Sequence, residues 1–360
     1  MRILVVNAGS SSLKLSVLDG DERVAGRNVP AGPQGWDTEA LSSFCQGLQV
    51  DAVGHRVVHG GDRYTAPVRI DADVRQHLEE LTALAPLHQP KSLAGMDAVT
   101  DLFPDVAAVA CFDTAFHASL PAGASTYALP LEWRQRWGLR RYGFHGLSHA
   151  WASRRVAQLM ERSPLRVVVC HLGAGASLCA VEDGRSVDTT MGFTPLEGLV
   201  MATRSGSVDP GLLLWLLERT ELTVREVADV LEHRSGLLAL AGTGMKELEA
   251  RLPAGDERAR LGWDVYLHRV VSGVGAMAAA MGGLDAMAFT GGVGENSSLL
   301  RQEVCDRLSF LGVELDPVAN ADPGPDLCVS VDSARTRAYV IEAREDLEVA
   351  RGVREALGQR

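Results

Sequence analysis

Histidine side chains are concentrated in five short motifs that contain or adjoin glycine and proline. Seven of the ten histidines lie in GHRVVHGG (54–61), LAPLHQP (84–90), FDTAFHASLP (112–121), YGFHGLSH (142–149) and HLGAG (171–175). Two arginines have similar surroundings: Arg56 lies in the first motif, and Arg204 lies in ATRSGS (202–207). Small neighbours leave a guanidinium room to hold an oxyanion through two N–H donors. The sequence therefore indicates a site for anionic groups.

Asp113 is a candidate catalytic or metal-binding carboxylate. It follows the apolar run Ala107–Phe112, which predicts a β-strand. In α/β folds, functional carboxylates often follow the carboxyl end of a strand. The position alone does not separate a functional role from a structural one.

Two histidine pairs raise the alternative of zinc binding. His55 and His59 are four residues apart, as are His145 and His149. The zinc motif HExxH is absent, Gly146 disfavours a helix between the second pair, and no cysteine cluster adds ligands. We therefore expect no zinc site, while a structural role for individual histidines stays open.

The elements that must position these residues show an internal repeat. Shifting the sequence by 164 positions places Val5 on Val169, Gly9 on Gly173, Val17 on Val181, Asp19 on Asp183 and Gly20 on Gly184. Each copy reads as a strand, a turn of small residues, a second strand and an Asp-Gly turn, which is a hairpin signal. The small residues at each hairpin tip allow backbone N–H groups to approach a phosphate. A Walker A motif is absent, so P-loop chemistry is excluded.

Strands and helices alternate after each hairpin, which predicts α/β halves with largely parallel sheets. The predicted helices are 38–49, 73–84, 222–233, 244–252, 256–283 and 345–357, and the predicted strands are Ala107–Phe112, Ala286–Thr290 and Arg337–Ile341. The glycine-rich GGVGEN (291–296) is expected to be a loop. Residues 30–36 and 316–326 are expected to be surface loops.

Composition narrows the class of protein. The chain has 360 residues and a net charge of −11, which argues against a nucleic-acid-binding protein but not against an anionic substrate. The six cysteines are scattered without a CxxC motif, which indicates buried thiols in a reducing compartment. The N-terminus lacks a signal-peptide pattern, and the longest weakly polar run, Val270 to Leu284, is too short to span a bilayer. We expect a cytoplasmic protein without membrane or nucleic-acid partners.

Nine stretches, in order along the chain, resemble the acetate kinases of the acetate and sugar kinase, Hsp70 and actin superfamily. They are NAGSSSLK (7–14), GHRVVHGG, LAPLHQP, FDTAFHASLP, YGFHGLSH, HLGAGASL (171–178), MGFTPLEGL (191–199), ATRSG and GGVGEN. The resemblance implies an α/β protein of two duplicated actin-like (ribonuclease H-like) halves with an interdomain cleft. The implied domains are residues 1–148, with helix 346–360 packing back on them, and residues 149–345. It also implies a homodimer.

The resemblance implies reversible, Mg²⁺-dependent (or Mn²⁺-dependent) phosphoryl transfer from ATP to acetate, giving acetyl phosphate and ADP. The implied catalytic residues are Arg56, Asp113, His145 and Arg204, and the implied metal-site residues are Asn7 and Glu345. Acetate would contact Arg56, Val58, Leu87, His88, Phe144 and Pro195. The nucleotide would contact Ser10, Ser12, Lys14, His171, Leu172, Gly173, Ala174, Gly175, Gly244, Met245, Lys246, Gly292, Val293, Gly294, Glu295 and Asn296.

Departures from the family pattern fall on the nucleotide side. Ala174 stands in place of an asparagine, Ser207 in place of an aspartate and Lys246 in place of an arginine, and the stretch 235–248 lacks the usual aspartate. These differences leave the phosphoryl donor open: ATP, another nucleoside triphosphate, or pyrophosphate. Propionate and butyrate stay open as acceptors because one methylene changes binding by only about 1–3 kcal/mol.

Three other classes of protein are weighed against a carboxylate kinase. A sugar kinase or chaperone-like ATPase would share the hairpins but lack FDTAFH, YGFHG and Arg56. A binding-only relative would have lost Arg56, Asp113, His145 or Arg204, all of which are present. A butyrate kinase would share the N-terminal and glycine motifs but match the acetate-side motifs less well.

Overall fold

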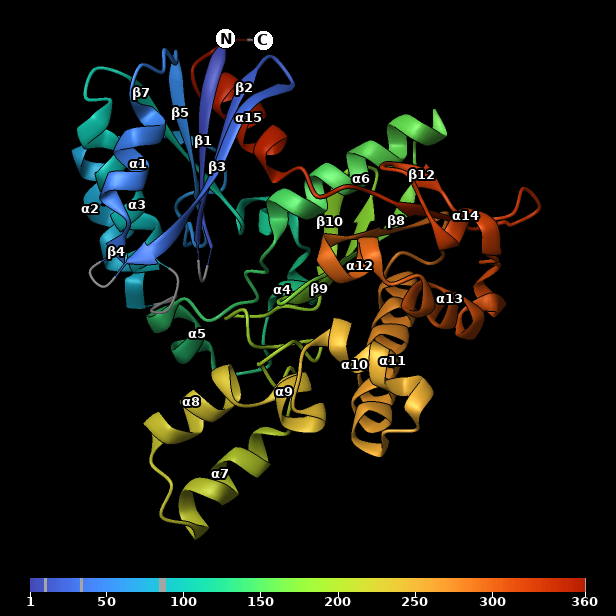
Figure 1. Ribbon diagram of the computed structural model, residues 1–360. Helices are drawn as coiled ribbons and strands as arrows, with labels where there is room; N and C mark the ends of the chain where they lie inside the picture. Colours follow the sequence, from blue (N-terminus) through green and yellow to red (C-terminus); the bar gives the residue numbers. More distant parts are fainter. Residues whose placement is uncertain (10–11, 33–34, 84–88, 360) are drawn as a thin grey trace. The chain divides into compact units, whose positions relative to one another are not determined.

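The computed structural model describes residues 1–9, 12–32, 35–83 and 89–359 (Figure 1). The chain divides into two compact units. Unit 1 comprises Met1–Ala118, Phe144–Trp151 and Arg344–Arg360, and unit 2 comprises Ser119–Gly143 and Ala152–Ala343. The boundary expected between residues 148 and 149 falls inside helix α6 (Gly146–Met160). Residues 119–143 belong to unit 2, not to the first domain as expected from the sequence.

Unit 1 contains a mixed seven-stranded sheet. Its strands are β1 (Arg2–Ala8), β2 (Ser12–Asp19), β3 (Glu22–Gly32), β4 (Gly35–Trp36), β5 (Ala52–Val57), β6 (Val68–Arg69) and β7 (Ala107–Phe112), in the order β4-β3-β2-β1-β5-β7-β6. Strands β1, β5 and β7 are parallel to one another, and β2 and β3 form an antiparallel meander with β1. The carboxyl ends of the three parallel strands therefore lie at one edge of the sheet.

Helices cover both faces of this sheet because the side chains of β1 alternate between them. Leu4 and Val6 share a buried apolar cluster with residues of α1 (Thr38–Cys45) and α3 (Gln89–Leu102). Ile3 and Val5 share another with residues of the C-terminal helix α15 (Glu345–Ala356). Helix α2 (Ala72–Glu80) contributes to a third cluster, with β5 and β7. The C-terminal helix α15 and the first strand β1 thus contribute to the same hydrophobic core.

Unit 2 repeats the strand arrangement of unit 1. Its strands are β8 (Arg166–Leu172), β9 (Ala176–Glu182), β10 (Arg185–Thr189), β11 (Ala286–Thr290), β12 (Leu327–Cys328) and β13 (Arg337–Val340), in the order β10-β9-β8-β11-β13-β12. The order β3-β2-β1-β5-β7 of unit 1 matches β10-β9-β8-β11-β13, which confirms the predicted duplication. The hairpin tips differ by one residue, because Ala8 pairs with Leu13 whereas Leu172 pairs with Ala176.

The helices of unit 2 include one long helix, α11 (Glu257–Ala280), which packs on β9 with one face buried. The others are α4 (Ala122–Ser125), α5 (Leu131–Trp137), most of α6, α7 (Pro210–Arg219), α8 (Val224–His233), α9 (Gly236–Ala241), α10 (Met245–Arg251), α12 (Gly291–Asn296), α13 (Ser298–Arg307) and α14 (Pro317–Ala321). Short 3₁₀ helices span Leu81–Ala83, Ala115–Ser119, Leu252–Ala254 and Ser309–Leu311. None of the helices in the described ranges combines the length and the hydropathy that a bilayer crossing needs.

Three segments expected to be loops contain regular structure. GGVGEN forms α12, residues 317–321 form α14, and β3 and β4 extend into residues 30–36. The glycine between His145 and His149 also does not prevent a helix, because Gly146 begins α6. Helix α14 is capped by Asp316, side chains of Glu295 and Arg301 bind the backbone of α12, and β4 pairs with β3. The glycine and proline content of a segment does not report such contacts.

Candidate functional site

Arg56 and Asp113 form a bidentate ion pair at the edge of the unit 1 sheet. Neighbouring parallel strands bring them together, because Arg56 lies near the end of β5 and Asp113 directly follows β7. Arg56 donates from Nη2 to Oδ2 of Asp113 at 2.6 Å and from Nε to Oδ1 at 2.9 Å. The side chain of Asp113 is 1% exposed and that of Arg56 is 15% exposed. The guanidinium thus holds a carboxylate through two parallel hydrogen bonds.

Asn7 and Glu345 complete this group, which we call the Arg56 cluster (Asn7, Arg56, Asp113 and Glu345). Arg56 Nη1 donates to Asn7 Oδ1 at 3.0 Å, and Asn7 Nδ2 donates to Glu345 Oε2 at 2.7 Å. Register explains the first contact, since Asn7 on β1 lies beside Arg56 on β5. Glu345 is the first residue of α15. Four predicted residues that are far apart in the sequence are therefore brought into one hydrogen-bonded cluster.

Electrostatic coupling within the cluster keeps Arg56 charged. Burial alone would lower the pKa of Arg56, but the nearby charges of Asp113 and Glu345 and the hydrogen bonds that Arg56 donates to Asp113 raise it. Burial raises the pKa of Asp113, and the charge and hydrogen bonds of Arg56 act in the opposite direction. Arg56 is therefore a cation that two carboxylates already face.

His145 lies beside Asp113, at the start of α6. The backbone N–H of Gly146 donates to the carbonyl oxygen of Asp113 at 2.9 Å. A Cβ atom at Gly146 would lie 2.1 Å from that oxygen, so only glycine permits this approach. His145 itself has a φ of 57°, a backbone conformation that is uncommon for residues other than glycine. Such conformations persist where surrounding contacts enforce them, often at functional sites.

Phe144, expected to shape the acetate site, is a core residue of unit 1. Its side chain is 1% exposed, and its ring packs edge-to-face against His59 at a centroid distance of 5.6 Å. Its carbonyl oxygen lies 3.0 Å from Nε2 of His117, which must carry the proton because a carbonyl only accepts. The backbone that presents His145 is thus fixed by two buried histidines.

The remaining predicted residues of unit 1 are partly described. Val58 is buried directly after β5. Ser12 and Lys14 lie on β2, where exposed Lys14 pairs in register with Asn7. Ser10, Leu87 and His88 lie outside the described residues.

Six of the predicted nucleotide residues line one pocket of about 340 Å³ in unit 2. They are Gly173, Ala174, Gly244, Met245, Lys246 and Val293. The β8–β9 turn, the start of α10 and helix α12 supply them. We call this the Ala174 pocket. Ala202, Leu237, Glu247 and Tyr266 also line it and were not predicted individually. Ala202 lies in ATRSG, and Leu237 and Glu247 lie in the stretch 235–248, so a local signal existed for them; Tyr266 on α11 has none.

Other predicted nucleotide residues lie next to this pocket or brace its walls. His171 and Leu172 end β8, and Gly173 N donates to Gly175 O at 2.9 Å within the turn. Glu295 Oε1 accepts from the backbone N–H groups of Gly291 at 2.9 Å and Ala343 at 3.2 Å.

Helix α12, which carries the residues Gly292, Gly294, Glu295 and Asn296, is held by its own side chains and by Arg301. Asn296 Nδ2 donates to Gly292 O at 2.8 Å, and buried Arg301 donates to the carbonyls of Gly294 and Glu295 at 2.9 and 2.8 Å. Burial raises the pKa of Glu295. The side chains of Glu295 and Asn296 thus support the backbone of the glycine-rich segment.

Arg204 lies in unit 2 and forms an ion pair and a hydrogen bond within its own unit. Its Nε lies 3.2 Å from Oε2 of Glu232, and its Nη1 donates to the carbonyl oxygen of Pro195 at 3.3 Å. Burial lowers the pKa of Arg204, while the charge and hydrogen bond of Glu232 act against that shift. Glu232 was not predicted, since no local motif marks a single glutamate on a helix.

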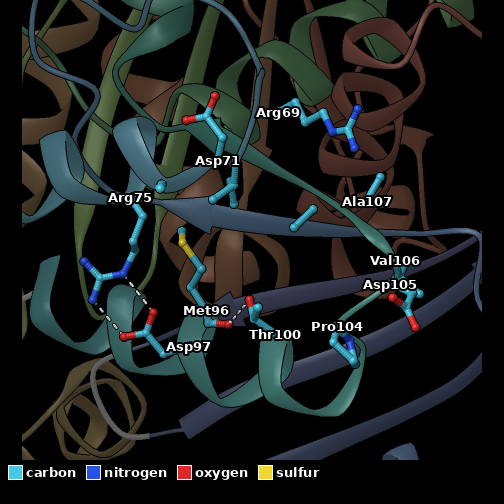
Figure 2. A pocket seen from close by; sticks show the side chains of 13 residues that line it. Arg69, Asp71, Arg75, Met96, Asp97, Thr100, Pro104, Asp105, Val106 and Ala107 are labelled. Atoms are coloured by element: carbon cyan, nitrogen blue, oxygen red, sulfur yellow. Dashed lines mark hydrogen bonds and ion pairs between the residues drawn. The ribbon is translucent and has the colours of Figure 1, made fainter.

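Figure 2 shows a second pocket, of about 390 Å³, in unit 1. Several of its polar side chains bind one another or nearby backbone: Arg75 pairs with Asp97 at 2.7 and 2.8 Å, and Asp71 accepts from Val74 N. Thr100 donates to the carbonyl of Met96. None of the predicted site residues is among those that line it, so it receives no role in the site.

Comparisons with known proteins agree on one family. The acetokinase family model matches residues 39–351. The chain is 45% identical to the acetate kinase of Nostoc punctiforme over 87% of this chain and 78% of that one. It is 40% identical to the acetate kinase of Pseudothermotoga lettingae over 99% and 97%.

Solved structures give the same result. Porphyromonas gingivalis acetate kinase superposes with a TM-score of 0.90 at 34% identity, covering 99% of both chains. A propionate kinase from Francisella tularensis superposes with a TM-score of 0.92 at 32% identity, covering 98% of both. The chain therefore belongs to the acetokinase family, phosphotransferases that use a carboxyl group as acceptor.

Proposed function

We propose that this protein transfers a phosphoryl group directly and reversibly between ATP and acetate, giving ADP and acetyl phosphate. The observation that carries the proposal is the bidentate Arg56–Asp113 pair, in which a partly buried cation already holds a buried carboxylate. Relatives of up to 45% identity bear the name acetate kinase. The proposal assigns the acceptor to the Arg56 cluster in unit 1 and the nucleotide to the Ala174 pocket in unit 2.

The chemistry requires charge neutralisation more than proton transfer. Acetate is ionised at pH 7, so no base has to deprotonate it before it attacks phosphorus. Negative charge spread over the three equatorial oxygens must instead be met by cations and hydrogen-bond donors. We assign this role to Arg56, Arg204 and His145. Asp113 then orients the guanidinium of Arg56 and is not a base in the forward reaction.

The donor set of the Arg56 cluster fits a hard cation such as Mg²⁺ or Mn²⁺. Asn7 and Glu345 offer amide and carboxylate oxygens, which these ions prefer. No group of three or more His, Cys, Asp or Glu in the described part of the chain is arranged as a metal site. Mg²⁺ commonly takes one or two carboxylates and completes its shell with water and phosphate. When bound, it would supply charge neutralisation beside Asn7 and Glu345.

The Ala174 pocket supports a nucleotide as donor. Ala174, Ala202 and Leu237 provide small and apolar walls, and Lys246 provides a cation. Pockets for bases are usually apolar with a few polar groups. Two of these side chains, Ala174 and Lys246, are departures from the family pattern, so we keep another nucleoside triphosphate or pyrophosphate as alternative donors.

The acceptor is proposed as acetate, with propionate as a poorer substrate. One family relative of 32% identity is a propionate kinase, and a methyl pocket rejects one extra methylene by only about 1–3 kcal/mol. Buried Val58 follows Arg56 by two residues, which supports its role in a small apolar wall.

We further propose a homodimer formed through α7 and α8. Leu212, Leu214 and Trp215 on α7 are 47%, 60% and 55% exposed, and Val224 on α8 is 72% exposed. Exposed apolar groups of this kind mark association surfaces. Sedimentation of the wild type and of Trp215→Glu tests this: the wild type should be a dimer, and the variant should dissociate. A monomeric wild type would contradict it.

All six cysteines, which lie in the described ranges, are free thiols, and this supports a cytoplasmic location.

A matrix of donors and acceptors tests the proposed reaction. Purified protein with Mg²⁺ would receive ATP, GTP or pyrophosphate together with acetate, propionate or butyrate, and acyl phosphate would be trapped as hydroxamate. ATP with acetate should dominate, and Arg204→Ala should lose activity. Saturation with another donor but not with ATP would retain the acceptor assignment and overturn the donor assignment.

A further inference from the structure

Glu232 contacts Arg204 from the last turn of α8. Its Oε2 lies 3.2 Å from Nε of Arg204, and the two side chains are 19% and 18% exposed. Partial burial on both sides reduces the screening that weakens surface ion pairs. The pair is therefore a defined contact rather than an encounter between solvated side chains.

The backbone around Arg204 is attached to the same end of α8. Thr203 Oγ1 donates to the carbonyl of Glu232 at 2.9 Å, and Ser205 N donates to the carbonyl of Leu231 at 3.0 Å. Ser235 N, just beyond the helix, donates to the carbonyl of Thr203 at 2.9 Å. The residues on either side of Arg204 are thus fixed relative to Glu232.

Gly236 packs closely against the backbone that carries Arg204. It has a φ of 63°, and a Cβ there would lie 2.2 Å from Met201 O and 2.7 Å from Arg204 O. Only glycine therefore lets the chain after α8 pass so close to the arginine backbone.

The guanidinium is held on two edges. Glu232 faces Nε, and the carbonyl of Pro195 accepts from Nη1. An ion pair on one edge and a hydrogen bond on another restrict both the position and the plane of a rigid guanidinium. This orientation matters only if Arg204 must meet an anion of defined geometry.

Helix stability does not explain the position of Glu232. A carboxylate in the last turn of a helix is opposed by the helix dipole. On the same helix, Asp229 also pairs with an arginine, Arg234, at 2.8 Å, but there both side chains are about half exposed, at 47% and 59%. Asp229 thus provides an internal control for loss of a carboxylate from α8.

We propose that Glu232 is a positioning residue for phosphoryl transfer, orienting the guanidinium of Arg204 toward the transferred group. This inference rests on the proposed function. Glu232 does not touch the substrate and acts through Arg204. Because small displacements of catalytic groups reduce rates by up to about 100-fold, loss of this contact should lower kcat rather than weaken nucleotide binding.

The test compares Glu232→Ala, Glu232→Gln and Asp229→Ala with the wild type in acetyl phosphate formation from Mg-ATP and acetate. We expect Glu232→Ala to lower kcat by about 10- to 100-fold, with the KM for ATP changed less than about twofold. Glu232→Gln keeps an oxygen that can accept from Nε and should recover most of the lost kcat. Asp229→Ala should match the wild type.

A double variant separates a positioning role from a general structural one. In the background of Arg204→Ala, Glu232→Ala should cause no further loss of kcat, because the group it orients is gone. Wild-type kcat in Glu232→Ala, or full additivity in the double variant, would overturn the inference while the proposed function stands. If Glu232→Ala does not fold, the test uses folded Glu232→Gln. A kcat of Glu232→Gln as low as that of Arg204→Ala would then overturn the inference. A wild type that forms no acetyl phosphate would refute the proposed function itself.

Discussion

Arg56 holds Asp113 through two hydrogen bonds, from Nη2 at 2.6 Å and from Nε at 2.9 Å, across neighbouring parallel strands. Asp113 is almost fully buried, so the pair forms away from solvent. The geometry makes Asp113 the group that sets the plane of the guanidinium.

Removing Asp113 should therefore affect both stability and catalysis. Asp113→Ala leaves the charge of Arg56 poorly compensated, which typically destabilises by about 3–5 kcal/mol. Denaturant titration measures this change, and a loss of kcat of at least about 100-fold should accompany it in the protein that remains folded. An unchanged unfolding free energy would show that the pair is not the buried contact described.

Gly146→Ala should disrupt the approach of α6 to Asp113. The added Cβ would lie 2.1 Å from the carbonyl oxygen of Asp113, so backbone must move and carry His145 with it. We expect a destabilisation of about 1–3 kcal/mol and a reduced kcat. Gly275→Ala is the matched control: nothing lies within 4 Å of its Cβ in the middle of α11, so this change should be neutral or stabilising. Equal behaviour of the two variants would contradict the prediction.

The elements that carry regular patterns could be predicted closely from the sequence. Strands β7 and β11 have the predicted bounds, and α15 begins at the predicted residue. These elements are set by local patterns of apolar residues. Hydrophobic periodicity and the repeat at 164 positions therefore predict them. Helix α14 was missed although Asp316 and Pro317 form a helix-start signal.

The parts that could not be predicted depend on side-chain contacts that local propensity does not report. GGVGEN has poor helix propensity, and α12 forms because Arg301 and Glu295 bind its backbone. The pairing of Glu232 with Arg204 joins residues on different segments and leaves no local signature. The resemblance implied one site for Arg56, Asp113, Asn7 and Glu345, but their hydrogen bonds follow from the register of β1, β5 and β7 and from the start of α15, which no motif reports.

Lys246→Ala should weaken ATP binding selectively. Lys246 is the one cation among the ten residues that line the Ala174 pocket, and a lost charge-assisted hydrogen bond corresponds to roughly a tenfold or larger change in binding. The KM for ATP should rise by about tenfold while the KM for acetate stays constant. Arg260→Ala removes an exposed cation from α11 and serves as the control. A rise in the KM for acetate instead would place Lys246 elsewhere in the reaction.

Buried His55 should make stability depend on pH. Burial lowers the pKa of His55 to about 4 from 6.5, with the charge of Asp97 acting in the opposite direction. Between these values the unfolded chain binds the proton more readily, so the free energy of unfolding falls as the pH falls from 6.5 toward 4. The slope from this histidine is about 1.4 kcal/mol per pH unit at most.

Denaturant titrations between pH 4.5 and 7 measure this dependence. His55→Leu should reduce the slope of the unfolding free energy against pH, because leucine cannot take up a proton. Above pH 7 the slopes of the two proteins should be equal. Parallel pH profiles for the wild type and the variant would show that His55 does not contribute to the dependence.

Acetyl phosphate formation from ATP and acetate is the most direct test of the central claim. Wild type and Arg56→Ala would be compared with Mg²⁺ under hydroxylamine trapping, with folding of both checked by circular dichroism. We expect a rate that saturates with both substrates in the wild type and falls by at least about 100-fold in the variant. A folded wild type that forms no acetyl hydroxamate, or an Arg56→Ala variant as active as the wild type, would contradict it.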